Sequence, residues 1–258
     1  MEKFREEALV LEQQMLQEGI YSIIIETKDI AKASVPGQFV SVYSKDGSKL
    51  LPRPISICDT DGSKLRLVYR VVGFGTNEFS KLKKGDTVTI MGPLGNGFPI
   101  KEKNAVLVAG GIGIPPMLKL AKAIKEQYKD ISVTTVLGYR DKNTFLDKEF
   151  EKYGEVVIAT DDGSLGVHGN VIDAMKDKNI VPEVLYACGP TPMLRGIKAY
   201  SVEKDFEAYI SLEEKMACGI GACLACVCRT KEKDEHSNVN NTRICKDGPV
   251  FNAKEVEI

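Results

Sequence analysis

The sequence predicts a multidomain α+β fold: an antiparallel β-barrel domain, a parallel α/β domain and a small cysteine-rich C-terminal segment. Three observations lead to this prediction: short β-branched runs before residue 100, strands that alternate with helices after it, and cysteines gathered near the C-terminus. A chain of 258 residues can form two cores, because a domain commonly holds about 100 to 200 residues. We place the domains at residues 1–100, 101–210 and 211–258.

The first part contains short runs that alternate or are rich in β-branched residues, at 8–15, 21–26, 39–43, 65–72 and 87–91. Turn residues separate them at Pro36-Gly37, Asp46-Gly47, Asp61-Gly62 and Lys84-Gly85-Asp86. This pattern predicts a small antiparallel barrel or sandwich.

From residue 105 the pattern changes to strand, turn and helix. The apolar strand 105–109 and a glycine turn precede a helix at 116–128, in which apolar residues recur at helical spacing. The unit repeats as 133–137 with 147–153, 156–160 with 170–176, and 184–188 with 193–200, before a last strand at 207–211. Such alternation predicts a parallel sheet covered by helices on both faces. Residues 229–243 are polar and without periodicity, which predicts an exposed loop.

Composition excludes several classes of function. The chain has 35 basic and 36 acidic residues, so it offers no overall attraction to nucleic acid or anionic lipid. No apolar run approaches the roughly 18 residues of a membrane span, and the charged N-terminus does not resemble a secretory signal. A cytoplasmic protein with no nucleic-acid or membrane partner is expected. The cysteines number seven, which is odd, and five of them lie in the last 41 residues, which favours a metal or redox role for that end.

The cysteines follow a recognisable spacing. Cys218, Cys223 and Cys226 form CxxxxC followed by xxC, and Cys245 comes after a long excursion, which is the plant-type pattern for a [2Fe-2S] cluster. The residues between them, Gly219, Gly221, Ala222 and Ala225, are small enough for the backbone to fold tightly and direct its amides at the sulfurs.

Other interpretations of the cysteines stay open. Cys223 and Cys226 alone form the CxxC knuckle that zinc also uses. Cys228 would share a face with Cys226 in an extended segment, so spacing leaves it open as a ligand, although we do not select it. Cys58 lies in an apolar strand, where a free cysteine packs as a small hydrophobe.

Several segments suit phosphates. Arg53, in the segment 51–56, has the planar guanidinium that pairs with a pyrophosphate, although a solvated turn is the alternative. Glycines at 73–77 precede a short predicted helix at 78–82, and such a helix start exposes amides that bind phosphate or simply form a turn. The turn at 93–98 is expected to end the barrel as a rigid turn, and a loop that covers a bound nucleotide is the alternative.

Two later segments follow the strand–glycine–helix pattern. In 108–117 a buried strand leads to Gly110, Gly111 and Gly113, where a dinucleotide can approach closely, yet the GxGxxG fingerprint is absent and a tight connection is the alternative. Cys188 and Gly189 repeat the pattern at the carboxyl end of a later strand, the edge at which open α/β sheets bind ligands.

The motifs RPIS, YRxxGxGT, GPLGNGFP, AGGIGIPP and ACGP, in that order, resemble the ferredoxin-NADP reductase superfamily. CGIGACLACVC with the later ICKDGPVF resembles the electron-transfer subunits of class 1B dihydroorotate dehydrogenases over essentially the whole chain. The resemblance implies that FAD is held by Arg53, Pro54, Ile55, Ser56, Val68, Tyr69, Arg70, Gly75 and Thr76. It also implies NAD(H) at Gly110, Gly111, Gly113, Cys188 and Gly189, and cluster ligation by Cys218, Cys223, Cys226 and Cys245.

The sequence departs from these families at two places. Many members of the wider superfamily have an aromatic residue at the position of Ile55, to stack on the flavin. The excursion from Cys226 to Cys245 is also long, and if it displaces Cys245 then Cys228 is the rival fourth ligand.

The implied function is electron transfer between NAD and a partner FMN subunit that oxidises dihydroorotate in pyrimidine biosynthesis, in a heterotetramer of two copies each. A flavin is needed because NADH delivers electrons in pairs and the cluster accepts them singly. His168 and His236 lie outside the motifs, and a turn or helix-capping role is expected for His168.

Three further expectations concern the partner contact, the preferred dinucleotide and the rival functions. Ile220, Leu224 and Val227 would contact the partner or pack on the second domain. Arg140 could meet the 2'-phosphate of NADPH, but the neighbouring Asp141 would oppose that phosphate, so NADH is expected. Rival functions are the flavin subunit of an NADH-dependent ferredoxin-NADP reductase or sulfide dehydrogenase, and a non-catalytic zinc or redox sensor.

Overall fold

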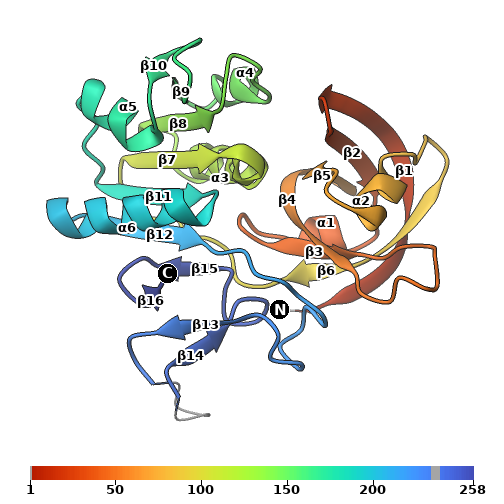
Figure 1. Ribbon diagram of the computed structural model, residues 1–258. Helices are drawn as coiled ribbons and strands as arrows, with labels where there is room; N and C mark the ends of the chain where they lie inside the picture. The colour runs from red at the N-terminus through yellow and green to blue at the C-terminus, as the bar shows by residue number, and fades with distance from the viewer. Residues whose placement is uncertain (1, 234–238) are drawn as a thin grey trace.

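The computed structural model describes residues 2–233 and 239–258 (Figure 1). The first part is a closed antiparallel barrel with strand order β1-β2-β5-β4-β3-β6. Its strands are β1 (Phe4–Gln17), β2 (Ile20–Glu26), β3 (Phe39–Val42), β4 (Arg53–Asp61), β5 (Lys64–Arg70) and β6 (Thr87–Leu94). The predicted barrel is therefore present, and the segment at 51–56, expected to end one strand or begin the next, begins β4.

Alternation of side chains explains the barrel. Residues that face inward, among them Ile25, Ile57, Leu65 and Ile90, are fully buried and form one core. Two short helices lie at its ends, α1 (Ile30–Ala33) and α2 (Phe74–Phe79).

The helix predicted at 78–82 is wrong by four residues, because α2 begins at Phe74. The Thr76 hydroxyl accepts hydrogen bonds from the amides of Val72 and Gly73, at 2.9 and 3.2 Å, and so satisfies donors at the helix start. Gly75 and Thr76 consequently lie in the first turn of α2 rather than in a preceding loop.

The second part is a seven-stranded sheet of order β10-β9-β8-β7-β11-β12-β15, in which only β15 is antiparallel to its neighbour. Its strands are β7 (Ala105–Gly110), β8 (Val133–Tyr139), β9 (Glu155–Thr160), β10 (Val167–His168), β11 (Val184–Cys188), β12 (Glu207–Ser211) and β15 (Val250–Asn252). The helices are α3 (Ile114–Gln127), α4 (Asp147–Phe150), α5 (Val171–Asp177) and α6 (Thr191–Lys204), with a 3-10 turn, η1 (Gly111–Gly113), before α3.

The helices cover both faces, as the alternation predicted. α3 and α4 share one core with the sheet and face the barrel, whereas α5 and α6 cover the other face (Figure 1). Of the turn or capping role expected for His168, the capping role is wrong: Asn170 caps α5 by accepting hydrogen bonds from Ile172 N and Asp173 N. His168 lies on the edge strand β10, close to the turn at Gly163.

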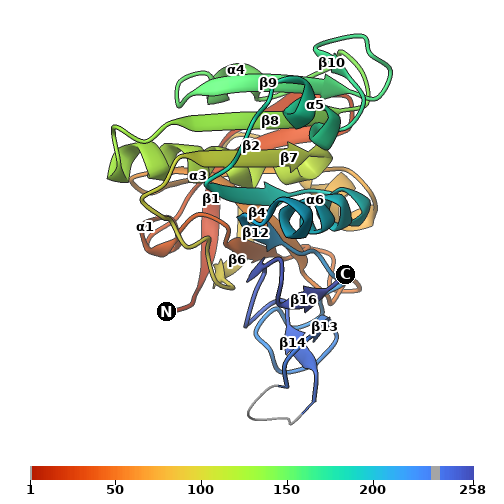
Figure 2. The ribbon, with the colours of Figure 1, turned by 90° about the vertical axis from the view of Figure 1, so that its left-hand side faces the viewer.

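The C-terminal part is a small lobe below both domains (Figure 2). It holds a three-stranded sheet, β14-β13-β16, built from β13 (Val227–Thr230), β14 (Asn241–Arg243) and β16 (Val256–Glu257). The predicted loop at 229–243 is thus wrong at both ends, because Arg229 pairs with Asn241. Neither β13 nor β14 has a fully buried face, so no alternation of apolar residues marks these two strands in the sequence. His236 lies outside the described residues. In the described part of the chain, no helix is long and apolar enough to cross a membrane.

Polar side chains tie the barrel to the second domain. Lys119 of α3, only 6% exposed, donates hydrogen bonds to Ser34 Oγ at 2.9 Å and Thr60 Oγ1 at 2.5 Å. Arg66 of β5 forms a two-pronged ion pair with Glu149 of α4, at 2.7 and 3.0 Å. Burial lowers the pKa of Lys119 to about 8, although the nearby Asp59 carboxylate raises it.

We expect the Lys119→Met variant to lose a pH-dependent gain in stability. Between pH 8 and pH 10.5 Lys119 keeps its proton in the unfolded chain but has released it in the folded chain. The free energy of unfolding of the wild type should therefore rise with pH relative to that of the variant. The gain should be about 2 kcal/mol over this window, measured by urea unfolding.

Lys122→Met is the matched control. Burial lowers the pKa of Lys122, but its hydrogen bond to Asp59 outweighs burial and raises that pKa. The Lys122→Met variant should therefore keep the rise in unfolding free energy with pH that Lys119 provides. Unfolding free energies of the wild type and Lys119→Met that stay parallel from pH 8 to pH 10.5 would contradict the prediction.

Candidate functional site

A cleft of about 380 Å³ opens where the barrel, the second domain and the C-terminal lobe meet. Its walls contain every predicted flavin residue except Gly75: Arg53, Pro54, Ile55, Ser56, Val68, Tyr69, Arg70 and Thr76. Gly75 lies behind Arg53, because a Cβ added there would sit 2.3 Å from Arg53 Nε. The structure therefore brings the nine residues to one place.

The barrel wall is rigid at Tyr69. This side chain is 2% exposed, stacks on Tyr21 with ring centroids 6.1 Å apart, and meets Phe79 edge-on at 6.4 Å. Its hydroxyl lies 3.4 Å from Gln13 Oε1. Burial raises the pKa of Tyr69, so the phenol stays protonated and can donate a hydrogen bond.

Nine further residues line the cleft that the sequence did not predict: Phe39, Val72, Ile112, Ser211, Leu212, Glu213, Glu214, Met216 and Pro249. The stretch from Ser211 to Met216 leaves the carboxyl end of β12, which is the edge where open α/β sheets bind ligands. The strand order of the parallel sheet could thus have identified this stretch as part of a ligand site. Burial raises the pKa of Glu213, and the Arg70 guanidinium partly offsets this.

The two glycine turns of the second domain touch each other. A Cβ on Gly113 would lie 2.4 Å from the Cys188 carbonyl oxygen, and one on Gly189 would lie 3.2 Å from Gly110 N. Arg70 Nη2 lies 3.6 Å from the place a Cβ on Gly111 would occupy, so this turn faces the cleft. All five predicted nicotinamide residues therefore lie at one junction.

Cys188 is 1% exposed at this junction. Burial raises the pKa of its thiol, assisted by the Glu213 carboxylate, while a hydrogen bond with Ser211 lowers it. The side chain is a neutral thiol, which excludes a thiolate nucleophile at neutral pH.

The cysteines of the C-terminal lobe contact one another in two pairs. Cys218 and Cys223 share a side-chain hydrogen bond, and so do Cys226 and Cys245. Backbone amides also point at the sulfurs: Ile220 N and Ala222 N lie 3.4 and 3.3 Å from Cys218 Sγ, Gly221 N lies 3.1 Å from Cys245 Sγ, and Cys245 N lies 3.4 Å from Cys226 Sγ.

These contacts change the acidity of the thiols. Burial raises the pKa of Cys218, but amides and the Cys223 side chain outweigh it and lower the pKa to about 6. Burial raises the pKa of Cys245 to about 12, and the hydrogen bond with Cys226 adds to this. Cys228 lies apart on β13, opposite Thr242, and burial raises its pKa to about 11.

The cleft and the cysteines share a wall. Met216 lines the cleft two residues before Cys218, and Pro249 lines it four residues after Cys245. The lobe is fixed to the barrel by the loop after β6, where Asn96 N donates to Gly248 O at 2.6 Å and Asn96 Nδ2 donates to Asp247 O at 2.9 Å.

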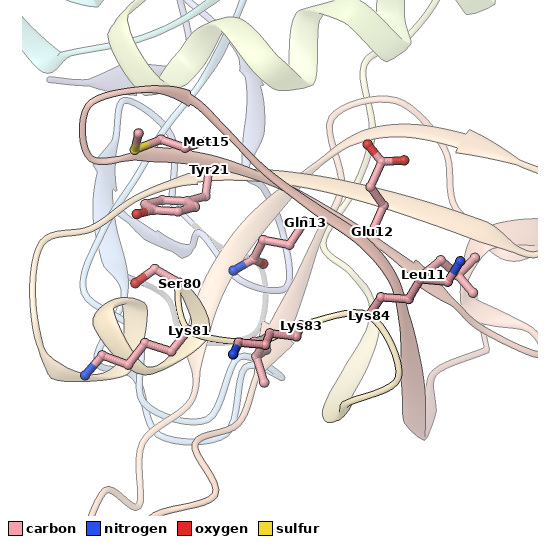
Figure 3. A pocket seen from close by; sticks show the side chains of 10 residues that line it. Leu11, Glu12, Gln13, Met15, Tyr21, Ser80, Lys81, Lys83 and Lys84 are labelled. Atoms are coloured by element: carbon pink, nitrogen blue, oxygen red, sulfur yellow. The ribbon is translucent and has the colours of Figure 1, made fainter.

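A second groove, of about 770 Å³, lies on the outside of the barrel between β1 and the segment after α2 (Figure 3). Lys81, Lys83 and Lys84 line it with Glu12 and Gln13. It contains none of the predicted site residues.

Comparisons with known proteins agree with this arrangement. Residues 213–257 match the family described as the iron-sulfur cluster binding domain of dihydroorotate dehydrogenase B, and residues 107–199 match the oxidoreductase NAD-binding domain. Relatives named dihydroorotate dehydrogenase B (NAD(+)), electron transfer subunit, are 44% identical in Listeria monocytogenes and 41% identical in Fusobacterium nucleatum. Each similarity covers 98% of both chains. The chain belongs to this family.

Solved structures support the same conclusion. The chain is similar to a solved structure of an NADH-dependent reduced ferredoxin-NADP oxidoreductase. The TM-score is 0.87 and the identity is 31%, and the similarity covers 97% of this chain and 89% of that one. A ferredoxin reductase of carbazole 1,9a-dioxygenase shares the fold, with a TM-score of 0.68, 20% identity and coverage of 80% and 67%. The predicted fold class is confirmed, as are the predicted iron-sulfur, flavin and NAD cofactor classes.

We expect Cys218 to be the more reactive thiol in protein freed of metal. At pH 7 a thiol with a pKa of about 6 is mostly thiolate, whereas buried Cys58, with a pKa raised to about 12, and buried Cys188 are not. Iodoacetamide should label Cys218 at least about tenfold faster, as read by peptide mass spectrometry. Cys218→Ser should remove this fast label, and equal labelling of Cys188 in the folded chain would refute the assignment.

Proposed function

We propose that this chain is the electron-transfer subunit of a class 1B dihydroorotate dehydrogenase, which moves electrons between NAD and a partner subunit through FAD and a [2Fe-2S] cluster. One observation carries the proposal: a cleft walled by the barrel, the glycine junction and Ser211 to Met216 lies beside two contacting pairs of cysteines. The three groups that such a function needs would then lie in series.

The cysteine pairs favour a two-iron cluster. Each iron of a [2Fe-2S] cluster takes two protein ligands, and the contacts fall into the pairs Cys218 with Cys223 and Cys226 with Cys245. Amides directed at sulfurs stabilise thiolates that carry the cluster's negative charge. We therefore assign these four as ligands and leave Cys228 out.

The cleft suits FAD. Arg53 and the amides at the start of α2 supply positive partners for a pyrophosphate, and Ser56 supplies a hydrogen-bond donor for a ring edge. A bound flavin accepts hydride and passes electrons on singly, which is the conversion this chain requires. The residues Arg53, Pro54, Ile55, Ser56, Val68, Tyr69, Arg70, Gly75 and Thr76 are assigned to it.

The glycine junction suits the nicotinamide dinucleotide. Gly111 leaves the backbone open where β7 meets α3, since only Arg70 Nη2 lies within 4 Å of a Cβ there. Gly110, Gly113 and Gly189 let the turn after β7 and the turn after β11 pack closely. Neutral Cys188 beside them presents a small, uncharged wall that excludes water from the reacting carbon.

Several features of the assembly belong to this proposal. The domains are 1–100, 101–210 and 211–258, the chain acts in the cytoplasm, and its partner is an FMN-containing catalytic subunit in a heterotetramer of two copies each. Ile220, Leu224 and Val227 are 42%, 61% and 39% exposed around the cysteines, which supports a partner contact there rather than packing on the second domain.

The test is anaerobic purification with any co-purifying flavoprotein, followed by an assay of dihydroorotate-dependent NAD+ reduction. The complex should show flavin and iron-sulfur absorption and catalyse this reaction. The rival reductase function is favoured if the complex instead couples NADH oxidation to ferredoxin or NADP+. A colourless zinc protein would overturn both.

Cysteine variants test the fourth ligand. Cys245→Ser should lose acid-labile sulfide and visible iron-sulfur absorption, because one iron loses a thiolate. Cys228→Ser should retain both, since Cys228 belongs to neither of the two cysteine pairs. FAD content reports folding in both variants, and the reverse result would make Cys228 the ligand.

Glycine variants test the flavin assignment. Gly75→Ala places a methyl group 2.3 Å from Arg53 Nε and should displace the guanidinium, which weakens FAD binding by about tenfold or more. Gly73→Ala is the matched control, because nothing lies within 4 Å of a Cβ there. Equal FAD dissociation constants for the two variants would argue against a phosphate role for Arg53.

A further inference from the structure

Two lysines of helix α3 fasten it to the barrel. Lys119 Nζ donates hydrogen bonds to Ser34 Oγ and Thr60 Oγ1, at 2.9 and 2.5 Å. Lys122 Nζ pairs with Asp59 Oδ1 at 3.0 Å and donates to the Thr60 carbonyl oxygen at 3.1 Å. Asp59 and Thr60 belong to β4, so these contacts cross from the second domain to the barrel and join one helix to one strand.

Both joined elements lead to the proposed redox site. β4 begins with the flavin residues 53–56, and Thr60 follows Ser56 by four residues on the same strand. α3 follows the glycine turn, and Lys119 follows Gly113 by six residues on the helix. A strand rises about 3.3 Å per residue and a helix about 1.5 Å. The lysine contacts therefore lie only about 13 Å from Ser56 and about 9 Å from Gly113 along these elements.

Apolar packing alone does not fix how the helix lies on the strand. Cys58 and Val68 of the barrel share one core with α3, but hydrophobic attraction has no preferred direction. Hydrogen bonds are directional, and Lys119, which makes two of them, is only 6% exposed. The side chains of Lys122 and Asp59 are 25% and 28% exposed, so water screens their ion pair only in part. The lysines therefore set the register between helix and strand.

We propose that Lys119 and Lys122 are positioning residues for hydride transfer between the nicotinamide and the flavin. In this step NADH gives hydride, with both electrons, to FAD and leaves as NAD+, so no other reactant is needed. The rate depends on the geometry in which the two rings meet, and a displacement of about 1 Å can cost about a hundredfold in rate. The inference rests on the proposed function and assigns a role in it to residues outside the cleft.

The test measures flavin reduction by NADH in a single turnover, using stopped-flow absorbance of the anaerobic, FAD-loaded full chain with its co-purified partner. Lys119→Met combined with Lys122→Met should lower the rate constant at saturating NADH by about tenfold or more. A loss of folded protein would lower the amplitude of the absorbance change and leave the rate constant unchanged. The rate constant therefore separates positioning from stability.

The acceptor of Lys119 offers a second, milder comparison. Thr60→Val removes the hydroxyl that accepts from Lys119, whereas Thr60→Ser keeps it. Thr60→Val should slow flavin reduction, and Thr60→Ser should leave its rate constant within about twofold of the wild type. Lys122 keeps its bond to the Thr60 backbone in both variants.

Lys125→Met is the matched control on the same helix. Lys125 Nζ donates to Lys129 O and Ile131 O, at 2.6 and 2.8 Å, and so stays within its own domain. This variant should reduce flavin at the wild-type rate. Deuterium exchange supplies a readout that needs no turnover: the amides of residues 111–122 should exchange faster in the double lysine variant and not in Lys125→Met.

Any of four results would overturn the inference. These are a double lysine variant whose rate constant stays within about twofold of the wild type, equal rate constants for Thr60→Val and Thr60→Ser, a Lys125→Met variant as slow as the double variant, and unchanged exchange at residues 111–122 in the double variant. A wild type whose flavin NADH does not reduce would instead refute the proposed function, so the two failures are distinguishable.

Discussion

The arrangement of the site depends on one backbone contact, between the loop that ends the barrel and the loop that ends the cysteine-bearing lobe. Gly95 has a φ of +74°, and a Cβ on it would lie 2.5 Å from Pro249 and 2.7 Å from the Gly248 carbonyl oxygen. Asn96 then uses its backbone and side-chain amides on the carbonyls of the opposite loop. Because Pro249 also lines the cleft, this contact fixes the distance between the cleft and the cysteines.

Cysteine thiols have different pKa values in the two environments that this packing creates. Cys58 and Cys188 lie in apolar cores, where burial opposes ionisation and keeps them neutral. Cys218 lies in a glycine-rich turn whose amides point inward, and these lower its pKa despite burial. Oriented backbone amides therefore let Cys218 ionise more readily than the thiols of the two cores.

Much of the fold and of the candidate site could be predicted from the sequence, because the sequence patterns that mark them are local. The glycine turns at Gly110 and Gly189 and the spacing of Cys218, Cys223 and Cys226 each mark a backbone requirement within a few residues. The cleft wall from Ser211 to Met216 could not be found in this way, because the strand at 207–211 was predicted but its place between β11 and β15 is known only from the strand order. Strands β13 and β14 were missed because they bury no continuous face.

The edge strand β15 has a consequence for how electrons travel. The chain leaves the large sheet at Ser211 on β12 and returns at Val250, which pairs with the same Ser211. The lobe is thus a closed excursion whose two ends are fastened to one strand, unlike carrier domains that swing on a single tether. Two attachments to one strand restrain such a lobe more than a single tether would. The cysteines therefore keep one position relative to β12, and a partner has to approach them there.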